Sequence, residues 1–220
     1  MTVFECMRNR ASKREFTSEK IGEGALNEIL EAVRRAPSTK NSQPWKLTLV
    51  EGARLERLRQ KLCEKFDEGA AMKPDFSSAL PPAYKPRAVD LGKKIFIHKG
   101  IAREDKAARR RHDRENFLLF GAPQAFILST IPEHSEANLM DLGIFSGYLM
   151  LALEAAGLAT CPQVSPAYYP DAIREVLPEL GEEKIAMVFP FGVAKPGSHV
   201  NEFRSPREEV GAWFRRLGEL

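Results

Sequence analysis

The sequence predicts one mixed domain in which helices and strands alternate. Its 220 residues suffice for one substantial core and do not demand a second. Apolar residues recur at Leu26, Ile29, Leu30 and Val33 with the period of an amphipathic helix. Strand-forming segments at 45–50, 125–130 and 185–192 are each preceded by helical ones. Together, these observations predict both kinds of element around a single core.

In the first half, a short helix is expected at 2–10 and the amphipathic helix ends before Pro37, since proline donates no amide hydrogen bond. A tight connection, 38–44, then leads into the strand at 45–50, and 55–66 is expected to be helical. The segment 72–86 contains four prolines and is expected to be an irregular insertion or lid.

Further along, 89–117 has a charged, helical composition and precedes the strand at 125–130. The segment 139–156 is apolar almost all round, which predicts a buried helix, and a second subunit could cover one side of it. An irregular stretch through Tyr169, a helix at 171–177 that Pro178 ends, and the strand at 185–192 follow. An amphipathic helix at 208–217 is expected in the tail.

Composition excludes several classes of protein. A net charge of +3 is too small to indicate a polyanionic partner, and no apolar run is long enough for a membrane span or a leader, so a cytoplasmic protein with no membrane partner is expected. Three distant cysteines without CxxC spacing predict buried thiols. The four histidines stand apart from one another, so no metal site is expected.

Three segments and the tail carry chemically informative residues. In 10–16, Arg10 and Arg14 flank Ser12, and guanidinium groups bind phosphate oxygens in a bidentate way. Taken alone, this segment could equally be a solvated helix end. Tail residues Arg204 and Arg207 offer further phosphate donors, although arginines are common on surfaces.

The second segment, 36–45, places hydroxyl and amide side chains between two prolines. Such a loop could present donors to the edge of a planar ring, or it could be an ordinary turn rich in capping residues. The third segment, 157–165, leaves the apolar helix and turns at Pro162, where a backbone amide could face a ring nitrogen.

These segments occur in the order and spacing of the nitroreductase family of FMN enzymes, which the chain resembles from Arg10 through its tail. The resemblance is carried by RASKREF, APSTKNSQPW, GLATCP and FPFG. The middle of the chain, through YKPR, GIARED, RENF and FGAP, is similar to the branch of nitrobenzoate and nitroarene reductases.

The resemblance implies an α+β fold, with a central and mainly antiparallel sheet wrapped by helices, in an intertwined homodimer with two FMN sites. It implies one FMN-binding domain over 1–220, with 72–123 as a variable lid or insertion region. NADH or NADPH would reduce the flavin and leave before a nitroaromatic or quinone-like acceptor enters the same pocket, a ping-pong hydride mechanism. No side chain is needed as a catalytic acid.

Position by position, the resemblance implies that Arg10, Ser12 and Arg204 lie near the FMN phosphate, with Ala11 beside them, and that Arg14 lies near the pyrimidine edge. The cofactor-binding loop from the other subunit would comprise Pro37, Ser38, Thr39 and Asn41, with Gln43 supporting it. The turn formed by Pro162, Gln163, Val164 and Ser165 would cover the ring, with the amide of Val164 or Ser165 near N5.

Two positions depart from the family pattern. Glu202 stands where many relatives place a lysine, so the phosphate site either loses one cation or uses Arg207 instead. Ser165 stands where a glycine is frequent, which affects the backbone of the turn.

Two alternatives remain open from the sequence. The same fold also supports flavin-dependent dehydrogenation, dehalogenation and flavin breakdown. The cations between Arg103 and Arg114 raise the question of nucleic-acid binding, but interleaved acidic residues favour a solvated helix face, or attraction of an acidic aromatic substrate, and no nucleic-acid partner is expected.

Overall fold

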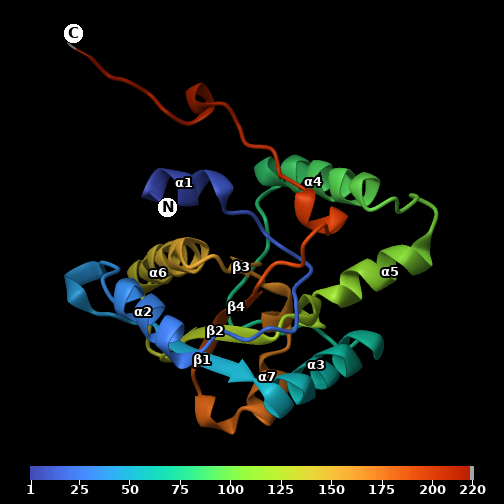
Figure 1. Cartoon of the computed structure of the whole chain (residues 1–220), viewed down its shortest axis with the longest axis horizontal. Coiled ribbons are helices and arrows are strands. Elements are labelled where there is room, and N and C mark those ends of the chain that lie inside the picture. The colour runs from blue at the N-terminus through green and yellow to red at the C-terminus, as the bar shows by residue number, and fades with distance from the viewer. Residues whose placement is uncertain (219–220) are drawn as a thin grey trace.

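The computed structural model describes residues 1–218 and has a four-stranded antiparallel sheet at its centre (Figure 1). The spatial order of its strands is β1 (Lys46–Glu51), β2 (Gln124–Thr130), β4 (Lys184–Gly192) and β3 (Ala159–Thr160). Every neighbouring pair is antiparallel. The expected α+β class with a central antiparallel sheet is therefore confirmed.

Helices cover both faces of this sheet. Helices α2 (Glu23–Val33) and α6 (Glu136–Ala155) contact each other on one side, and α3 (Gly52–Asp67) and α7 (Pro170–Val176) contact each other on the opposite side. Helix α1 (Val3–Asn9) lies over α6 (Figure 1). Helices α4 (Lys85–His98) and α5 (Lys106–Glu115) lie farther along the molecule, with α4 beside the C-terminal tail.

Strand β2 shows how the sequence divides the core between the two faces. Phe126 and Leu128 belong to the cluster that contains α2 and α6, whereas Ala125 and Ile127 belong to the cluster that contains α3 and α7. Because successive side chains of a strand point to opposite faces, a continuous apolar run fits a strand that is covered on both sides. All of β2 is accordingly buried.

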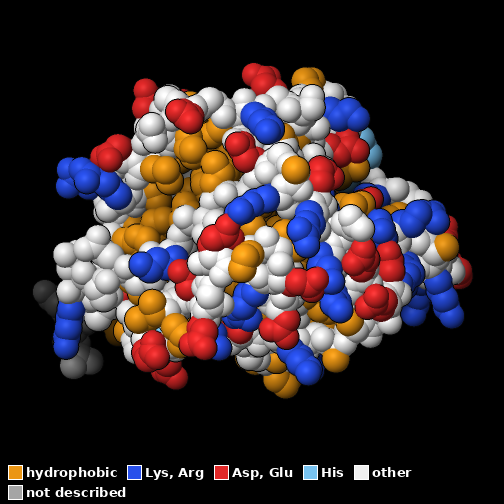
Figure 2. All heavy atoms as spheres, turned by 90° about the horizontal axis from the view of Figure 1, so that it is seen from below, with side chains coloured by type: hydrophobic (Ala, Val, Ile, Leu, Met, Phe, Trp, Pro, Cys, Tyr) orange, Lys and Arg blue, Asp and Glu red, His pale blue; other side chains and the backbone are white. Residues whose placement is uncertain are grey.

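Helix α6 is buried on one side only. Leu142, Phe145, Leu149 and Leu153 lie in the core, whereas an opposite stripe that includes Met140, Ile144 and Tyr148 is exposed. The prediction of a helix buried all round is thus wrong for a single chain. Figure 2 shows that one face of the molecule has a hollow where apolar side chains gather between charged borders.

The region between residues 70 and 123 differs from its expected outline. The predicted helical stretch 89–117 is broken by Gly100, whose φ of 65° favours glycine, and α4 begins earlier than expected with Pro86 in its first turn. Asp75 accepts a hydrogen bond from the Ile185 amide (2.9 Å) and pairs with Arg174. The first part of the predicted lid is therefore tied to the core.

Two further expectations need correction. The stretch after Gly157 contains the two-residue strand β3, which is too short to be recognised by alternation of apolar residues. The helix predicted at 208–217 is only a 3₁₀ turn at Val210–Ala212, with Trp213 and Phe214 exposed. Isolated helices of about ten residues are marginal unless an apolar face packs against something.

The three cysteines are buried free thiols, as predicted. Within residues 1–218, no helix combines the length and the apolar character that a membrane crossing needs.

Candidate active site

A cavity of about 280 Å³ lies between the end of α1, the segment after it, and the C-terminal tail. Five arginines line it, and four of them, Arg10, Arg14, Arg204 and Arg207, were predicted to bind the cofactor. The wall also contains the predicted residues Ala11 and Ser12, together with Arg8, Met7, Leu91, Phe203 and Ser205, which were not predicted. Two segments almost 190 residues apart thus form one cationic site.

Within residues 1–218, these five arginines lack the acidic partners that several arginines elsewhere in the molecule have. Arg54, Arg87 and Arg114 each lie within 3 Å of a carboxylate oxygen. Among residues 1–218, none of the five cavity arginines lies within 4 Å of one. Arg14, Arg204 and Arg207 donate only to nearby backbone carbonyls or the Ser205 hydroxyl. Such a donor set fits a phosphate group.

The edge of the sheet positions the first segment of this site. Ser12 forms a parallel bridge with Thr160 of β3, and the Lys13 amide donates to the Thr160 carbonyl (3.1 Å). The side-chain oxygen of Asn201 accepts hydrogen bonds from the Arg14 amide (2.7 Å) and the Glu15 amide (3.1 Å). Asn201, on the 3₁₀ turn η6 (His199–Glu202), is itself buried.

The predicted turn 162–165 follows directly from β3. Gln163 is buried, its backbone pairs with Val188 of β4, and its side chain donates to Asn116. The amides of Val164 and Ser165 stand at the start of the 3₁₀ turn η4 (Ser165–Tyr168) and have no hydrogen-bond partner within the described residues. Donors at the start of a helical turn are free to bind a ligand.

Cys161 lies between this turn and the arginine cluster. Burial raises the pKa of its thiol, while Arg14, Ser12 and Arg10 lower it. Burial is the larger effect, which keeps Cys161 a neutral thiol beside the cationic site.

The predicted loop 37–43 is held by one buried carboxylate. Asp141 on α6 accepts hydrogen bonds from the Thr39 amide (2.9 Å), the Thr39 hydroxyl (3.2 Å) and the Ser42 hydroxyl (3.3 Å). Lys40, Asn41 and Gln43 have positive φ angles of 51°, 57° and 46°. Non-glycine residues keep such angles only where the surroundings enforce them, so the loop has a defined shape.

Further contacts fix the base of the same loop. The Gln43 backbone amide donates to the Ser38 hydroxyl (2.9 Å), and Trp45 stacks on Phe145 of α6 with ring centroids 4.8 Å apart. Pro37 and residues 39–43 are exposed in the single chain.

The loop and the arginine cluster belong to opposite ends of α6. Asp141 lies in the first part of the helix, whereas Thr160 of β3 follows its last residue, Ala155. At a rise of about 1.5 Å per residue, the helix between Asp141 and Ala155 is about 20 Å long. One chain therefore does not bring these two groups of predicted residues together.

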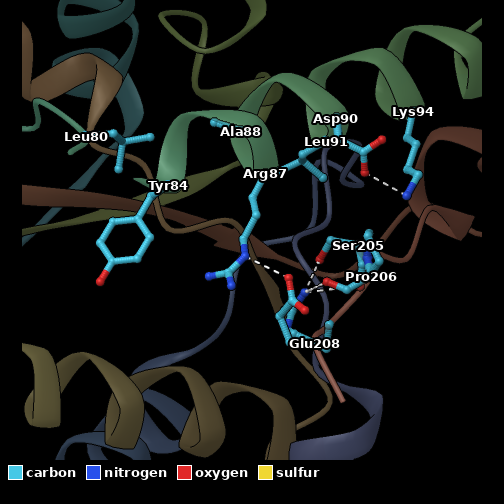
Figure 3. A pocket seen from close by; sticks show the side chains of 11 residues that line it. Leu80, Tyr84, Arg87, Ala88, Asp90, Leu91, Lys94, Ser205, Pro206 and Glu208 are labelled. Atoms are coloured by element: carbon cyan, nitrogen blue, oxygen red, sulfur yellow. Dashed lines mark hydrogen bonds and ion pairs between the residues drawn. The ribbon is translucent and has the colours of Figure 1, made fainter. Parts of the chain in front are cut away.

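A second cavity, of about 720 Å³, adjoins the first and shares Leu91, Ser205 and Arg207 with it. Figure 3 shows Arg87 projecting from α4 toward the tail, whereas Tyr84, at the end of the 3₁₀ turn Pro82–Tyr84, points away from the tail. Arg87 pairs with Glu208 (2.7 Å), so an ion pair joins α4 to the C-terminal segment.

The arginines of α5 are partly used within the chain. Arg109 lies over the Phe96 ring (4.7 Å), Arg110 lies over Phe66 (4.7 Å), and Arg114 pairs with Asp67 (2.9 Å). These contacts place α5 against its neighbours.

Sequence reasoning missed several residues that shape the site. Asn201 and Asp141 are single polar residues whose importance depends on long-range contacts, and Leu91 arrives from a separate helix. Arg8 could have been considered because it is a further cation close to Arg10. The histidines are not all isolated either: His98 and His199 stack with ring centroids 4.1 Å apart.

The departure at Glu202 also has a structural outcome. Its carboxylate lies 3.2 Å from His199 and outside the arginine-lined wall. The cavity is nevertheless rich in cations because Arg8 and Arg207 line it.

Comparisons with known proteins agree with this arrangement. Residues 7–193 match the family model described as the nitroreductase family. The chain belongs to the nitroreductase family. Nitroreductase NfnB of Mycolicibacterium smegmatis is 32% identical over 91% of this chain and 86% of its own. The 4-nitrobenzoate reductase of Pseudomonas putida is 30% identical over 96% of this chain and 93% of its own.

A solved nitroreductase structure is similar to this chain over its whole length. The FMN- and NADPH-dependent nitroreductase NfnB from Sphigopyxis sp. strain HMH covers 100% of both chains, with a TM-score of 0.94 and 28% identity. The sheet order and the covering helices described above are therefore those of the nitroreductase fold.

Proposed function

We propose that this chain is an FMN-dependent oxidoreductase that uses NADPH or NADH to reduce nitroaromatic or quinone-like compounds. The observation that carries the proposal is the cavity lined by five arginines that have no acidic partner within residues 1–218, in a chain of the nitroreductase family. The Sphigopyxis relative is FMN- and NADPH-dependent, and the Pseudomonas relative is a 4-nitrobenzoate reductase.

The residues present fit the phosphate of FMN. Arg10, Ser12 and Arg204 supply planar and hydroxyl donors from two rigidly joined segments, and Arg8 and Arg207 add positive charge. Guanidinium groups crowded together without carboxylates repel one another, and a bound dianion relieves that repulsion. The predicted contact of Arg14 with the pyrimidine edge, and of the Val164 or Ser165 amide with N5, remain parts of the proposal.

FMN bound there would supply the two-electron chemistry, taking electrons from the nicotinamide and passing them to the acceptor. The protein's own residues would orient the flavin and tune its redox potential. The positive charge of Arg14 favours extra electron density on the ring edge beside it. A backbone amide from the 162–165 turn donates one directed hydrogen bond. No side chain has to transfer a proton, which agrees with a site built from arginines and amides.

The same proposal includes a homodimer with shared active sites. The loop 37–43 lies at one end of α6 and the arginine cluster at the other, so a second copy is needed to bring that loop to a ring bound at the cluster. On α6, Met140, Gly143, Ile144 and Tyr148 form an exposed stripe at helical spacing. A Cβ atom added at Gly143 or Gly147 would meet no described atom of the chain within 4 Å. These glycines allow another helix to approach closely.

We treat residues 1–220 as one FMN-binding domain, with 72–123 as its variable region. Contacts of the α5 arginines within the chain do not support their use as an attractant for an acidic acceptor. The acceptor class therefore rests on the family and not on that helix. Dehydrogenation, dehalogenation and flavin breakdown stay as alternatives.

Purification followed by an absorbance spectrum tests the proposal. We expect a yellow protein that retains FMN through extensive dialysis and oxidises NADPH or NADH in the presence of a nitroarene. Arg10→Ala should lose FMN during the same dialysis, since one phosphate contact is gone. A colourless wild-type protein that FMN cannot reconstitute would refute the proposed function.

A further inference from the structure

One buried side chain joins the two segments that form the arginine cluster. The side-chain amide of Asn201 accepts from the Arg14 and Glu15 amides and donates through Nδ2 to the Glu15 carbonyl (2.7 Å). Asn201 is 5% exposed, so these three bonds are shielded from water. They are made to a segment more than 180 residues away along the chain.

The backbone carbonyl of Asn201 accepts hydrogen bonds from two cationic side chains. Its carbonyl oxygen accepts from the Lys13 ammonium (2.7 Å) and from Nη1 of Arg204 (3.2 Å). Burial lowers the pKa of Lys13 and the charge of Arg204 lowers it further, whereas Glu154 raises it. Two like charges are thus held near one oxygen by geometry.

Asn201 itself does not line the cavity, and neither does Lys13. Any effect of Asn201 on a ligand must therefore act through the residues that do, which are Arg14 and Arg204. The direction of the Arg14 side chain depends on the position of its backbone, and Asn201 fixes that backbone at two consecutive amides.

We propose that Asn201 is a positioning residue that sets the relative placement of Arg14 and Arg204, and thereby the affinity for the flavin phosphate and the redox potential of the flavin. The inference rests on the proposed function and gives a role to Asn201, which lies outside the family motifs, and to Lys13. Lys13 assists by donating a hydrogen bond to the carbonyl of Asn201.

A specific physical reason favours asparagine here. Its side chain offers an acceptor and a donor in one plane, which matches the alternating amide and carbonyl groups of residues 14 and 15. A leucine of similar size would leave these buried backbone groups without partners, and the segment would move to find water. The arginine cluster would then lose its fixed geometry.

The test compares affinities for FMN and riboflavin, which differ only in the phosphate. Apoprotein of wild type, Asn201→Leu and Lys13→Met is titrated with each ligand by flavin fluorescence, and the midpoint potential of each FMN-saturated protein is measured. The matched control is Gln124→Leu, which removes another buried amide that binds a backbone amide, that of Ile21 (2.9 Å), together with Glu51.

We expect Asn201→Leu to weaken FMN binding about tenfold while riboflavin binding changes little. A tenfold loss of affinity is about what the misplacement of one charged hydrogen-bond contact costs. Its midpoint potential should become more negative because Arg14 is no longer fixed. Lys13→Met should also weaken FMN binding, but by a smaller factor. Gln124→Leu should alter neither the FMN-to-riboflavin ratio nor the potential.

Unchanged FMN affinity and midpoint potential in folded Asn201→Leu would overturn the inference. So would a result in which Asn201→Leu loses as much affinity for riboflavin as for FMN and Gln124→Leu shows the same losses. If Asn201→Leu does not fold, Lys13→Met decides, and wild-type FMN affinity in that variant is evidence against the inference. A wild type that binds no flavin would overturn the proposed function, and this inference with it.

Discussion

The carboxylate of Asp141 accepts two hydrogen bonds from Thr39, one from its backbone amide at 2.9 Å and one from its hydroxyl at 3.2 Å. Although burial alone raises the pKa of the Asp141 carboxyl, hydrogen bonds from Thr39, Asn138 and Ser42 lower it below the ordinary value. The stabilisation is thus present above the unfolded-state pKa and is lost as pH falls through the folded-state pKa. The loop 38–43 owes its shape to this carboxylate.

Asp141→Ala should loosen that loop without disturbing the arginine cluster. If the loop contacts the ring in the partner, FMN affinity should fall on the order of tenfold, as expected for losing one charge-assisted hydrogen-bond anchor. Flavin fluorescence titration measures it. Thr39→Val, which keeps the backbone amide, should show a smaller loss. Wild-type affinity in Asp141→Ala would mean that the loop does not touch the flavin.

Patterns in the sequence were sufficient to predict the helices and strands that bury a regular apolar face. The helix containing Leu26, Ile29 and Val33 follows directly from apolar periodicity, and the strands β2 and β4 follow from short runs of strand-forming residues. Periodicity fails where one residue interrupts it, as at Gly100, or where an apolar face has nothing in its own chain to cover it, as at 208–217.

The candidate site divides in the same way. Arg10, Ser12 and Arg14 could be predicted because the motif RASKREF carries them, and Arg204 because the resemblance to the family extends through the tail. The structure gathers all four around one cavity. Asn201 and Asp141 could not, because their roles come from hydrogen bonds that span the chain. The loop 37–43 was predicted to act from another subunit, and its distance from the cluster is consistent with that hypothesis.

A pH-dependent contact joins α4 to η6. His98 and His199 each hydrogen-bond through Nε2 to the other's backbone carbonyl (2.8 Å). The His98 carbonyl, and secondly Glu202, raise the pKa of His199. A raised pKa contributes stability that is complete below the unfolded-state pKa and is lost as pH rises through the folded-state pKa.

His199→Gln should therefore lower the melting temperature relative to wild type more at about pH 5.5 than at about pH 8, on either side of the ordinary histidine range. Thermal denaturation at both pH values measures the difference. His134→Gln serves as a control, since His134 lies elsewhere, before α6. An equal difference at both pH values would show that the protonation of His199 has no influence.

The exposed stripe of α6 makes a prediction about assembly. Ile144→Asp places a charge in the middle of that stripe and should convert a dimer into monomers, with loss of FMN, because an unpaired buried charge costs several kcal/mol at an interface. Light scattering after size-exclusion chromatography measures the mass. Ile97→Asp, at an exposed apolar residue of α4, is the matched control and should stay dimeric. A monomeric wild type would contradict the shared-site proposal.

Arg14 provides a test on the flavin itself. Arg14→Ala should make the midpoint potential more negative by roughly 20 mV for each kcal/mol of lost stabilisation of the reduced ring, and should slow its reduction by NADPH. Arg14→Lys keeps the charge and should recover part of the shift. A redox titration gives the values. An unchanged potential in Arg14→Ala would remove Arg14 from the pyrimidine edge.

The central claim is that electrons pass from a nicotinamide through bound FMN to a nitroarene. An anaerobic titration of the purified holoprotein tests it most directly. We predict that about one equivalent of NADPH or NADH per flavin bleaches the FMN absorbance, as expected for a two-electron cofactor, and that adding 4-nitrobenzoate or nitrobenzene restores it. Absorbance that no reduced nicotinamide bleaches, or that no nitroarene restores, would contradict the account.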